Sequence, residues 1–174
     1  MPSTLVIAIA VIVGTVLLGA VIAKLARAGK MGLPYRRSKA LFSPAEQSFL
    51  AALDNAVGWE YRVFGKVRLA DVAAVKSGLT KSARRAALNR VAAKHFDFVV
   101  CRASDLSPVC AVELTDSSHN SQRAQARDEL VAKVCLAIGL PLLVFHASQA
   151  YSIPGVRARF TAAVSTAPHA AASG

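Results

Sequence analysis

An uncharged apolar stretch near the start most constrains what this chain can fold into. Residues 4–23 carry no charged side chain, and about 20 apolar residues in a helix are enough to cross a bilayer. The stretch has no polar stripe, unlike most helices that pack on a soluble core. It also lacks the charged start and the short apolar region of a cleaved secretory signal. We therefore predict one transmembrane helix, with the lipid bilayer as its partner through residues 4–23.

Six cations follow the apolar stretch with no acid among them, which accounts for part of the chain's formal net charge of +11. They are Lys24, Arg27, Lys30, Arg36, Arg37 and Lys39. Basic flanks stay on the cytoplasmic side of a membrane. The pattern therefore predicts a single-pass protein of a bacterial inner membrane with its C-terminal domain in the cytoplasm. These cations suit anionic lipid headgroups without any role in binding nucleic acid.

Composition divides the chain into four segments. Residues 1–27 form the transmembrane helix and the start of its basic flank, and residues 28–41 hold the glycine, proline and cations of a juxtamembrane linker. Residues 42–164 carry the patterns of one α/β domain, and residues 165–174 have the composition of a disordered tail. The chain's three cysteines, Cys101, Cys110 and Cys135, stand in apolar runs, which predicts buried free thiols.

The soluble part alternates helical and extended patterns. Ser43 to Glu46 is a capping-box signature and predicts a helix of about 13 residues. We further predict strands at 60–69, 95–102, 108–115 and 140–146, and helices at 82–93, 121–138 and 154–164. Residues 60–69 read as a strand with a wet, basic face and a possible bend at Gly65, and 140–146 as a fully buried strand. The order predicts one α/β domain with a mixed sheet.

A hairpin between 95–102 and 108–115 would bring two acids together. If its turn is centred on Asp105, Asp97 lies opposite Glu113 and His95 lies opposite Thr115. Two carboxylates so close repel unless a proton or a cation lies between them, and oxygen ligands favour Mg²⁺. The alternative is that each acid is merely solvated at a sheet edge, and a register slip of one residue would remove the pair.

Several stretches together resemble a known family over roughly residues 41–146. They are "LFSPAEQSFLAAL", "FGKVRLADV", "KHFDFVVC", "AVELTDSSH" and "RDELVAKVCLAIGLPLLVF". They are similar to the bacterial domain of unknown function 2726, assigned to the PD-(D/E)xK nuclease superfamily. The resemblance implies a restriction-endonuclease-like αβββαβ core and a site for Mg²⁺, or Mn²⁺, held by Glu46, Asp97 and Glu113. Asp116, His119, Arg127 and Asp128 match further characteristic positions. Spacing alone gives Glu46 another role, as the capping-box acid.

The chain departs from the superfamily motif at one position. A lysine normally ends the E-x-K motif, and the related family usually has an acid there, whereas this chain has Thr115. A hydroxyl cannot supply a positive charge. Lys133 or Lys94 could replace the lysine, and His119 could act as a base near neutral pH.

Three functions are therefore open from the sequence. The first is a metal-dependent nuclease in which Asp97, Glu113, His119 and Lys133 are catalytic. The second is an inactive module of the same fold that binds nucleic acid or a protein partner at the membrane. The third is an anchored structural domain whose acids bind no ligand.

Overall fold

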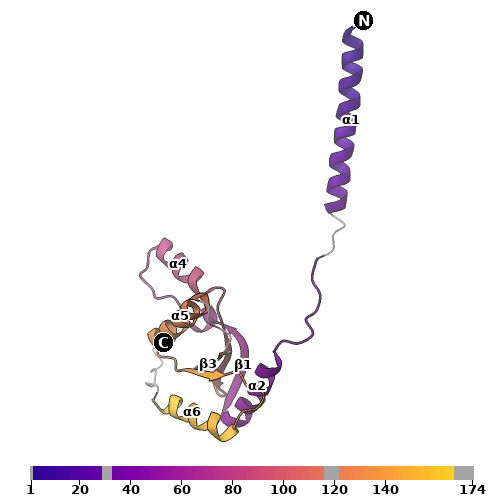
Figure 1. Ribbon diagram of the computed structural model, residues 1–174. Coiled ribbons are helices and arrows are strands. Elements are labelled where there is room, and N and C mark those ends of the chain that lie inside the picture. Colours follow the sequence, from indigo (N-terminus) through magenta and orange to yellow (C-terminus); the bar gives the residue numbers. More distant parts are fainter. Residues whose placement is uncertain (1, 29–32, 116–121, 167–174) are drawn as a thin grey trace. The chain divides into compact units, whose positions relative to one another are not determined.

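The computed structural model describes residues 2–28, 33–115 and 122–166 (Figure 1). The chain divides into two units, Met1–Leu41 and Phe42–Gly174. In the first unit, helix α1 (Pro2–Ala28) contains a segment, Ser3–Leu25, with a mean hydropathy of 3.0. Of the helices in the described residues, this one is long and apolar enough to cross a membrane, as the sequence predicted.

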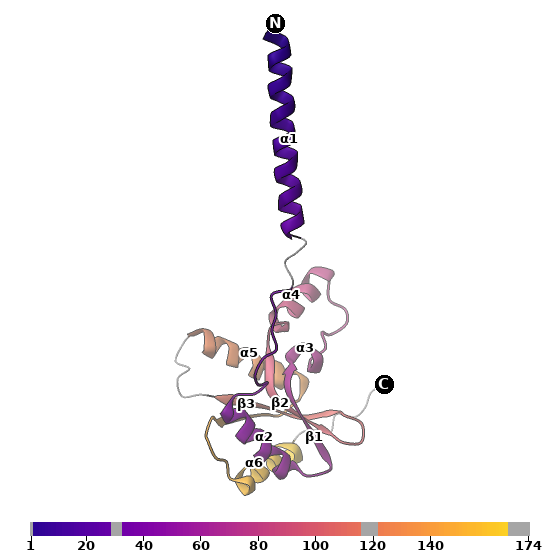
Figure 2. The same ribbon diagram turned by 90° about the vertical axis from the view of Figure 1, so that its right-hand side faces the viewer.

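The second unit is a four-stranded mixed sheet between two layers of helices (Figure 2). The strand order is β1-β2-β3-β4, antiparallel except for the parallel β3–β4 pair. In Figure 2, α2 and α6 lie on one face and α3, α4 and α5 on the other. The elements are α2 (Pro44–Val57), β1 (Tyr61–Arg68), α3 (Leu69–Val72), α4 (Lys81–Val91), β2 (His95–Arg102), β3 (Pro108–Thr115), α5 (Gln122–Ile138), β4 (Leu142–His146) and α6 (Ile153–Thr166). This confirms an α/β unit with a mixed sheet.

Local sequence signals explain where the helices begin and end. The Ser43 hydroxyl accepts the amide of Glu46, and the Glu46 carboxylate accepts the amide of Ser43, so the predicted capping box is present. Helix α5 ends at Ile138, and the next residue, Gly139, has φ +66°, a conformation that glycine adopts without steric cost. The predicted boundaries of both helices therefore hold to within a residue or so.

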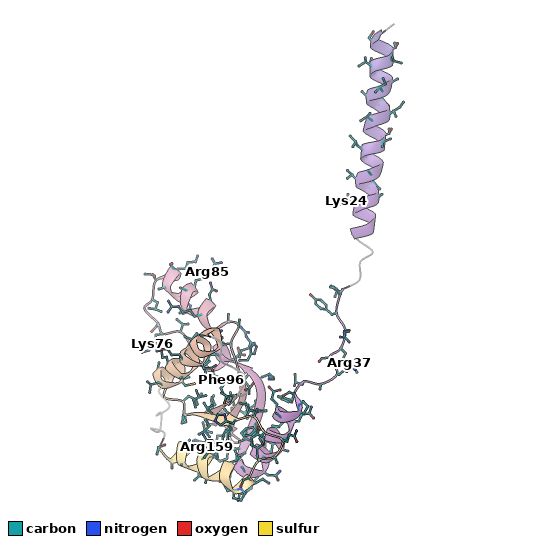
Figure 3. All side chains as sticks on the ribbon, viewed as in Figure 1. Lys24, Arg37, Lys76, Arg85, Phe96 and Arg159 are labelled. Carbon is teal, nitrogen blue, oxygen red and sulfur yellow. The ribbon has the colours of Figure 1, made fainter. Side chains whose placement is uncertain are left out.

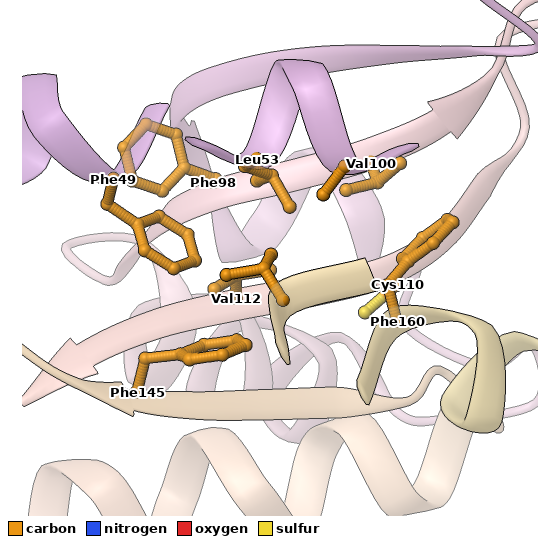
Figure 4. Close-up of a cluster of buried hydrophobic side chains, with 10 residues drawn as sticks. Phe49, Leu53, Phe98, Val100, Cys110, Val112, Phe145 and Phe160 are labelled. Atoms are coloured by element: carbon orange, nitrogen blue, oxygen red, sulfur yellow. The ribbon is translucent and has the colours of Figure 1, made fainter. Parts of the chain in front are cut away.

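Apolar side chains form one core on each face of the sheet. The first core packs α2 and α6 on the sheet and includes Phe49, Leu53, Phe98 and Phe145 (Figure 4). The second lies under α3, α4 and α5 and includes Leu69, Val91, Phe96, Val99, Val131 and Cys135. Two cores explain why β2 is apolar along most of its length, because both of its faces are covered. The three cysteines are buried and free, as predicted.

Three details differ from the sequence predictions. Strand β4 is not fully buried, because it is the edge strand of the sheet, and Val144 is 42% exposed. The short helix α3 was missed, since four residues are too few for a helical period to show. Helix α6 includes Ser165 and Thr166, which the sequence assigned to the tail; residues 167–174 lie outside the described part.

Strand β1 changes face at Lys66. Val63 packs in the first core and Val67 in the second, although a regular strand places residues four apart on one face. Lys66 lies between them with φ +56°, in the left-handed region that a lysine rarely adopts. The paired strand β2 changes face at the same level, because Phe98 is in the first core and Phe96 in the second. The sequence placed Lys66 on a solvated strand face, and this kink is why it is half-buried instead.

The kink is accompanied by a close aromatic contact. A Cβ on Gly65 would lie 2.2 Å from Cζ of Phe42, so the ring of Phe42 rests directly on the glycine. The same ring stacks on Phe98 with a centroid distance of 5.5 Å. Any side chain at position 65 would have to displace that ring.

We expect Gly65→Ala to destabilise the folded unit by about 1 kcal/mol, because the displaced Phe42 ring loses its packing on Phe98. Urea unfolding of the full chain in a nonionic detergent, followed by circular dichroism, measures the change. Gly155→Ala in helix α6 is the matched control, since its Cβ would make an ordinary contact of 3.5 Å with Ser152, the residue before the helix. That control should be neutral or stabilising. Equal stability of Gly65→Ala and the unmodified chain would contradict the close contact.

Candidate active site at the start of β2 and the end of β3

The hairpin register brings Asp97 and Glu113 to the same level of the sheet. The paired residues Phe98 and Val112, Val99 and Ala111, and Val100 and Cys110 follow the predicted register. The next pair in this register would be Asp97 and Glu113. There the backbone ladder gives way to a side chain, because Oδ2 of Asp97 accepts the amide of Leu114 at 2.9 Å.

Asp97 and Glu113 line one cavity of about 440 Å³. The other described lining residues are Lys66, Ala93, Lys94, His95 and Val131. Because Val131 belongs to α5, the cavity opens on the α5 side of the sheet. Two carboxylates and two ammonium groups therefore face one solvent-filled space, together with an imidazole. Such a mixture of charges suits an anionic ligand that a cation accompanies.

Lys66 joins Glu46 of α2 to Asp97 of β2. Its ammonium group forms an ion pair with Oε1 of Glu46 and lies 3.3 Å from Oδ1 of Asp97. Burial alone would lower the pKa of Lys66, but the hydrogen bond that it donates to Glu46 and the charge of Asp97 raise this pKa above its usual value. Burial would likewise raise the pKa of Glu46, but the hydrogen bonds from Lys66 and Ser43 lower it. Both groups are thus held in their charged forms at neutral pH.

Glu113 reaches toward the second core. Its Oε1 atom is buried. Burial raises the pKa of the Cys135 thiol to about 11, and the charge of Glu113 adds to that rise. The thiol of Cys135 therefore stays protonated beside the carboxylate. On this side of the site, α5 contributes apolar groups of the second core.

The remaining predicted site residues lie apart from the cavity lining or outside the described residues. Thr115 is half-buried, and its hydroxyl donates to the carbonyl of Phe145 on β4 at 3.3 Å. Lys133 is 69% exposed and forms an ion pair with Glu129 at 2.6 Å.

The other four follow β3 in the sequence. Asp128 is exposed on α5. Asp116 and His119 lie outside the described residues, and Arg127 lies on the described backbone of α5 with a side chain that the structure does not describe.

Two of the three predicted acidic ligands line the cavity. Among the residues that the structure describes, no group of three or more His, Cys, Asp or Glu side chains is arranged to hold a metal ion. Glu46 interacts through Lys66 and is not among the described lining residues. Asp97 and Glu113 remain, and their oxygen donors fit Mg²⁺, which proteins hold with one or two carboxylates plus water and substrate phosphates.

Sequence reasoning missed Lys66 as a site residue and underused Lys94. Alternation along β1 assigns Lys66 to the same face as Arg62 and Arg68, and only the kink brings it to the acids. The signal that could have found it is the Gly65-Lys66 pair inside an apolar strand, since glycine there marks a bend. Lys94 was named as a substitute lysine, and the structure places it at the cavity.

Comparisons with known proteins gave one match. The model of a family described as "Protein of unknown function (DUF2726)" matches residues 38–164, more than half of the chain. No curated protein matches, and no solved structure does.

We expect Glu46→Gln to destabilise the chain by about 1 to 2 kcal/mol at pH 7, because it removes the capping acid and the partner of Lys66. The native pKa of Glu46 lies below its ordinary value of 4.5. The contribution of this carboxylate is therefore complete above pH 4.5 and is lost as the pH falls through the lowered native pKa. Urea unfolding at a series of pH values from 3 to 7 should show the two curves converge in acid.

Glu129→Gln is the matched control for this experiment. Glu129 also pairs with a lysine and has a lowered pKa through its hydrogen bond with Lys133, but its side chain is 65% exposed. An exposed pair contributes little to stability. Equal effects of the two substitutions would show that the Glu46 pair stabilises no more than a surface pair.

Proposed function

The chain belongs to the DUF2726 family, and from this premise and the cavity geometry we propose a membrane-anchored nuclease-like domain. Its reaction would be metal-dependent hydrolysis of a phosphodiester in a nucleic acid, on a core of the PD-(D/E)xK type. The observation that carries the proposal is that Asp97 and Glu113 line one cavity with Lys66 and Lys94. Carboxylates that hold a metal and cations that meet phosphate are the groups this reaction needs.

Each side chain has a distinct role in the proposed reaction. Asp97 and Glu113 would hold Mg²⁺ or Mn²⁺. A metal bound there supplies charge neutralisation at the phosphate and lowers the pKa of a coordinated water. Lys94 binds the phosphate from the cavity wall, since ammonium groups favour its negative charge. Lys66 is a positioning residue, because its ion pair holds Oδ1 of Asp97 while the amide of Leu114 holds Oδ2.

This assignment also accounts for Thr115. Its hydroxyl is engaged with the carbonyl of Phe145, so it belongs to the junction of β3 and β4. The positive charge that a lysine supplies in the E-x-K motif would come instead from Lys94 and Lys66, which reach the cavity from the start of β2 and from β1.

A second function has its own supporting observation. The ammonium group of Lys66 offsets one of the two negative charges of Glu46 and Asp97, which are two of the three predicted metal ligands. Carboxylates that already pair with a lysine have less need of a divalent cation as a partner. The corresponding proposal is an inactive module of the same fold that binds nucleic acid or a protein partner.

The location follows from the first unit. We propose that α1 spans a bacterial inner membrane once and that the basic flank keeps the folded unit in the cytoplasm. Support comes from the length and hydropathy of Ser3–Leu25 and from the six cations that follow its apolar stretch.

The test of hydrolysis uses the full chain in a nonionic detergent with end-labelled DNA and RNA. We expect cleavage that requires Mg²⁺ or Mn²⁺ and falls about 100-fold or more in Glu113→Gln, because loss of a metal-holding carboxylate removes several kcal/mol of transition-state stabilisation. Glu129→Gln makes the same chemical change on the exposed face of α5 and should retain activity. Equal cleavage by Glu113→Gln and the unmodified chain would sink the proposed reaction. Salt-dependent binding without turnover, unchanged in Glu113→Gln, would favour the inactive module instead.

The test of topology uses introduced cysteines and a maleimide that does not cross membranes. We expect Ser3→Cys to react from the periplasmic side and Ser38→Cys to react only after the inner membrane is opened. The native thiols give a low background, because burial raises the pKa of Cys110 to about 12 and that of Cys135 to about 11. Burial also raises the pKa of Cys101. The reverse labelling pattern would contradict the proposed orientation.

A further inference from the structure

Residues 73–94, here called the basic arm, connect α3 to the start of β2. They hold six cations and no acid. Five of the six are exposed and Lys94 is half-buried at the cavity. The cations are Lys76, Lys81, Arg84, Arg85, Arg90 and Lys94. Figure 3 labels Lys76 and Arg85 on this insertion, and α4 stands away from the sheet in both Figure 1 and Figure 2.

The cations at the start of α4 do not stabilise this helix. A helix N-terminus favours acids and disfavours cations, because the aligned peptide dipoles place partial positive charge there. The first turn of α4 contains no acid, and Lys81, Arg84 and Arg85 all lie within its first five residues. The Thr80 hydroxyl caps the helix by accepting a hydrogen bond from the amide of Ala83. The start of the helix therefore does not depend on these three cations.

The arm is also only lightly packed. Within α4, Val91 at the C-terminal end is buried, and Leu88 one turn earlier is 39% exposed. Lys81, Arg84 and Arg85 are three and four residues apart, so the N-terminal half of α4 presents its cations to solvent on one face. The like charges on this surface repel one another, and an anionic ligand would relieve that repulsion.

We propose that the basic arm binds the phosphate backbone of a nucleic acid and delivers it to the cavity. An 11-residue helix is about 16 Å long, and phosphates of one DNA strand recur about every 3.4 Å along its axis. The cations continue from α4 to Lys94, which lines the cavity with Asp97 and Glu113. One polyanion can thus contact α4 and reach the carboxylates. The inference rests on the proposed function only in its choice of a nucleic acid as the ligand.

A nucleic acid fits this surface better than an anionic bilayer. The arm carries cations along α4 and ends at Lys94 in the cavity lining, whereas a membrane-bound helix would need an apolar face opposite its charges. The described apolar residues of α4 are alanines, Leu88 and the buried Val91, which do not form such a face.

The experiment measures binding in EDTA, so that it does not depend on a metal or on cleavage. The full chain in nanodiscs of phosphatidylcholine is titrated into fluorescently labelled DNA and RNA oligonucleotides at several salt concentrations. The test variant is Lys81→Gln/Arg84→Gln/Arg85→Gln. The matched control is Arg36→Gln/Arg37→Gln/Lys39→Gln, which removes two arginines and one lysine from the exposed stretch before α2.

We expect the arm variant to bind at least tenfold more weakly. We also expect the slope of log affinity against log salt to fall in magnitude by about 2 to 3, because each lost phosphate contact lowers that magnitude by up to about 1. The control should retain the slope of the unmodified chain. Equal weakening by both variants, or full affinity in the arm variant, would overturn the inference. So would loss of binding to anionic phosphatidylglycerol vesicles in the arm variant when nucleic-acid binding is unchanged. Intact binding without any cleavage would contradict the proposed reaction and leave the arm's role standing.

Discussion

The ion pairs of Lys66 are the interaction on which the rest of this structure depends. They connect the first turn of α2 to β2 across the point where both β1 and β2 change face. A left-handed lysine backbone costs free energy, and it persists where its surroundings hold it in place. Here two carboxylates and the ring of Phe42 against Gly65 provide that restraint. The apolar cores and the charged cavity are therefore parts of one arrangement.

Much of the fold could be predicted because its signals are local. The capping box at Ser43, the hairpin of β2 and β3, and the glycine after α5 each depend on a few neighbouring residues. The edge position of β4 could not be predicted, because a parallel pair with β3 is a choice among strands that periodicity does not encode. The predicted register of the hairpin holds from Phe98 to Val100 and shifts at Cys101. The sequence could not show that Asp97 turns to the amide of Leu114.

The candidate site was predicted in part for the same reason. Asp97 and Glu113 came from strand register and from the family resemblance, and both line the cavity. Lys66 could not be found by alternation, because a single backbone angle moves it from the solvated face to the acids. Lys133 illustrates the opposite case. It was a candidate because it lies on the helix that follows β3, and it forms an exposed ion pair with Glu129 of the same helix. The pattern of residue types along a strand does not show in which direction a side chain points where the backbone is kinked.

The seat of Phe42 has a mechanical consequence. Phe42 is the first residue of the folded unit after the stretch that follows α1. A pulling force transmitted along that stretch would load its ring before any strand of the sheet. The ring contacts Gly65, and Lys66 is the next residue. A force applied to Phe42 would therefore be transmitted to the ion pairs beside the cavity. The residues that orient Asp97 are therefore coupled, through the ring of Phe42, to the start of the folded unit.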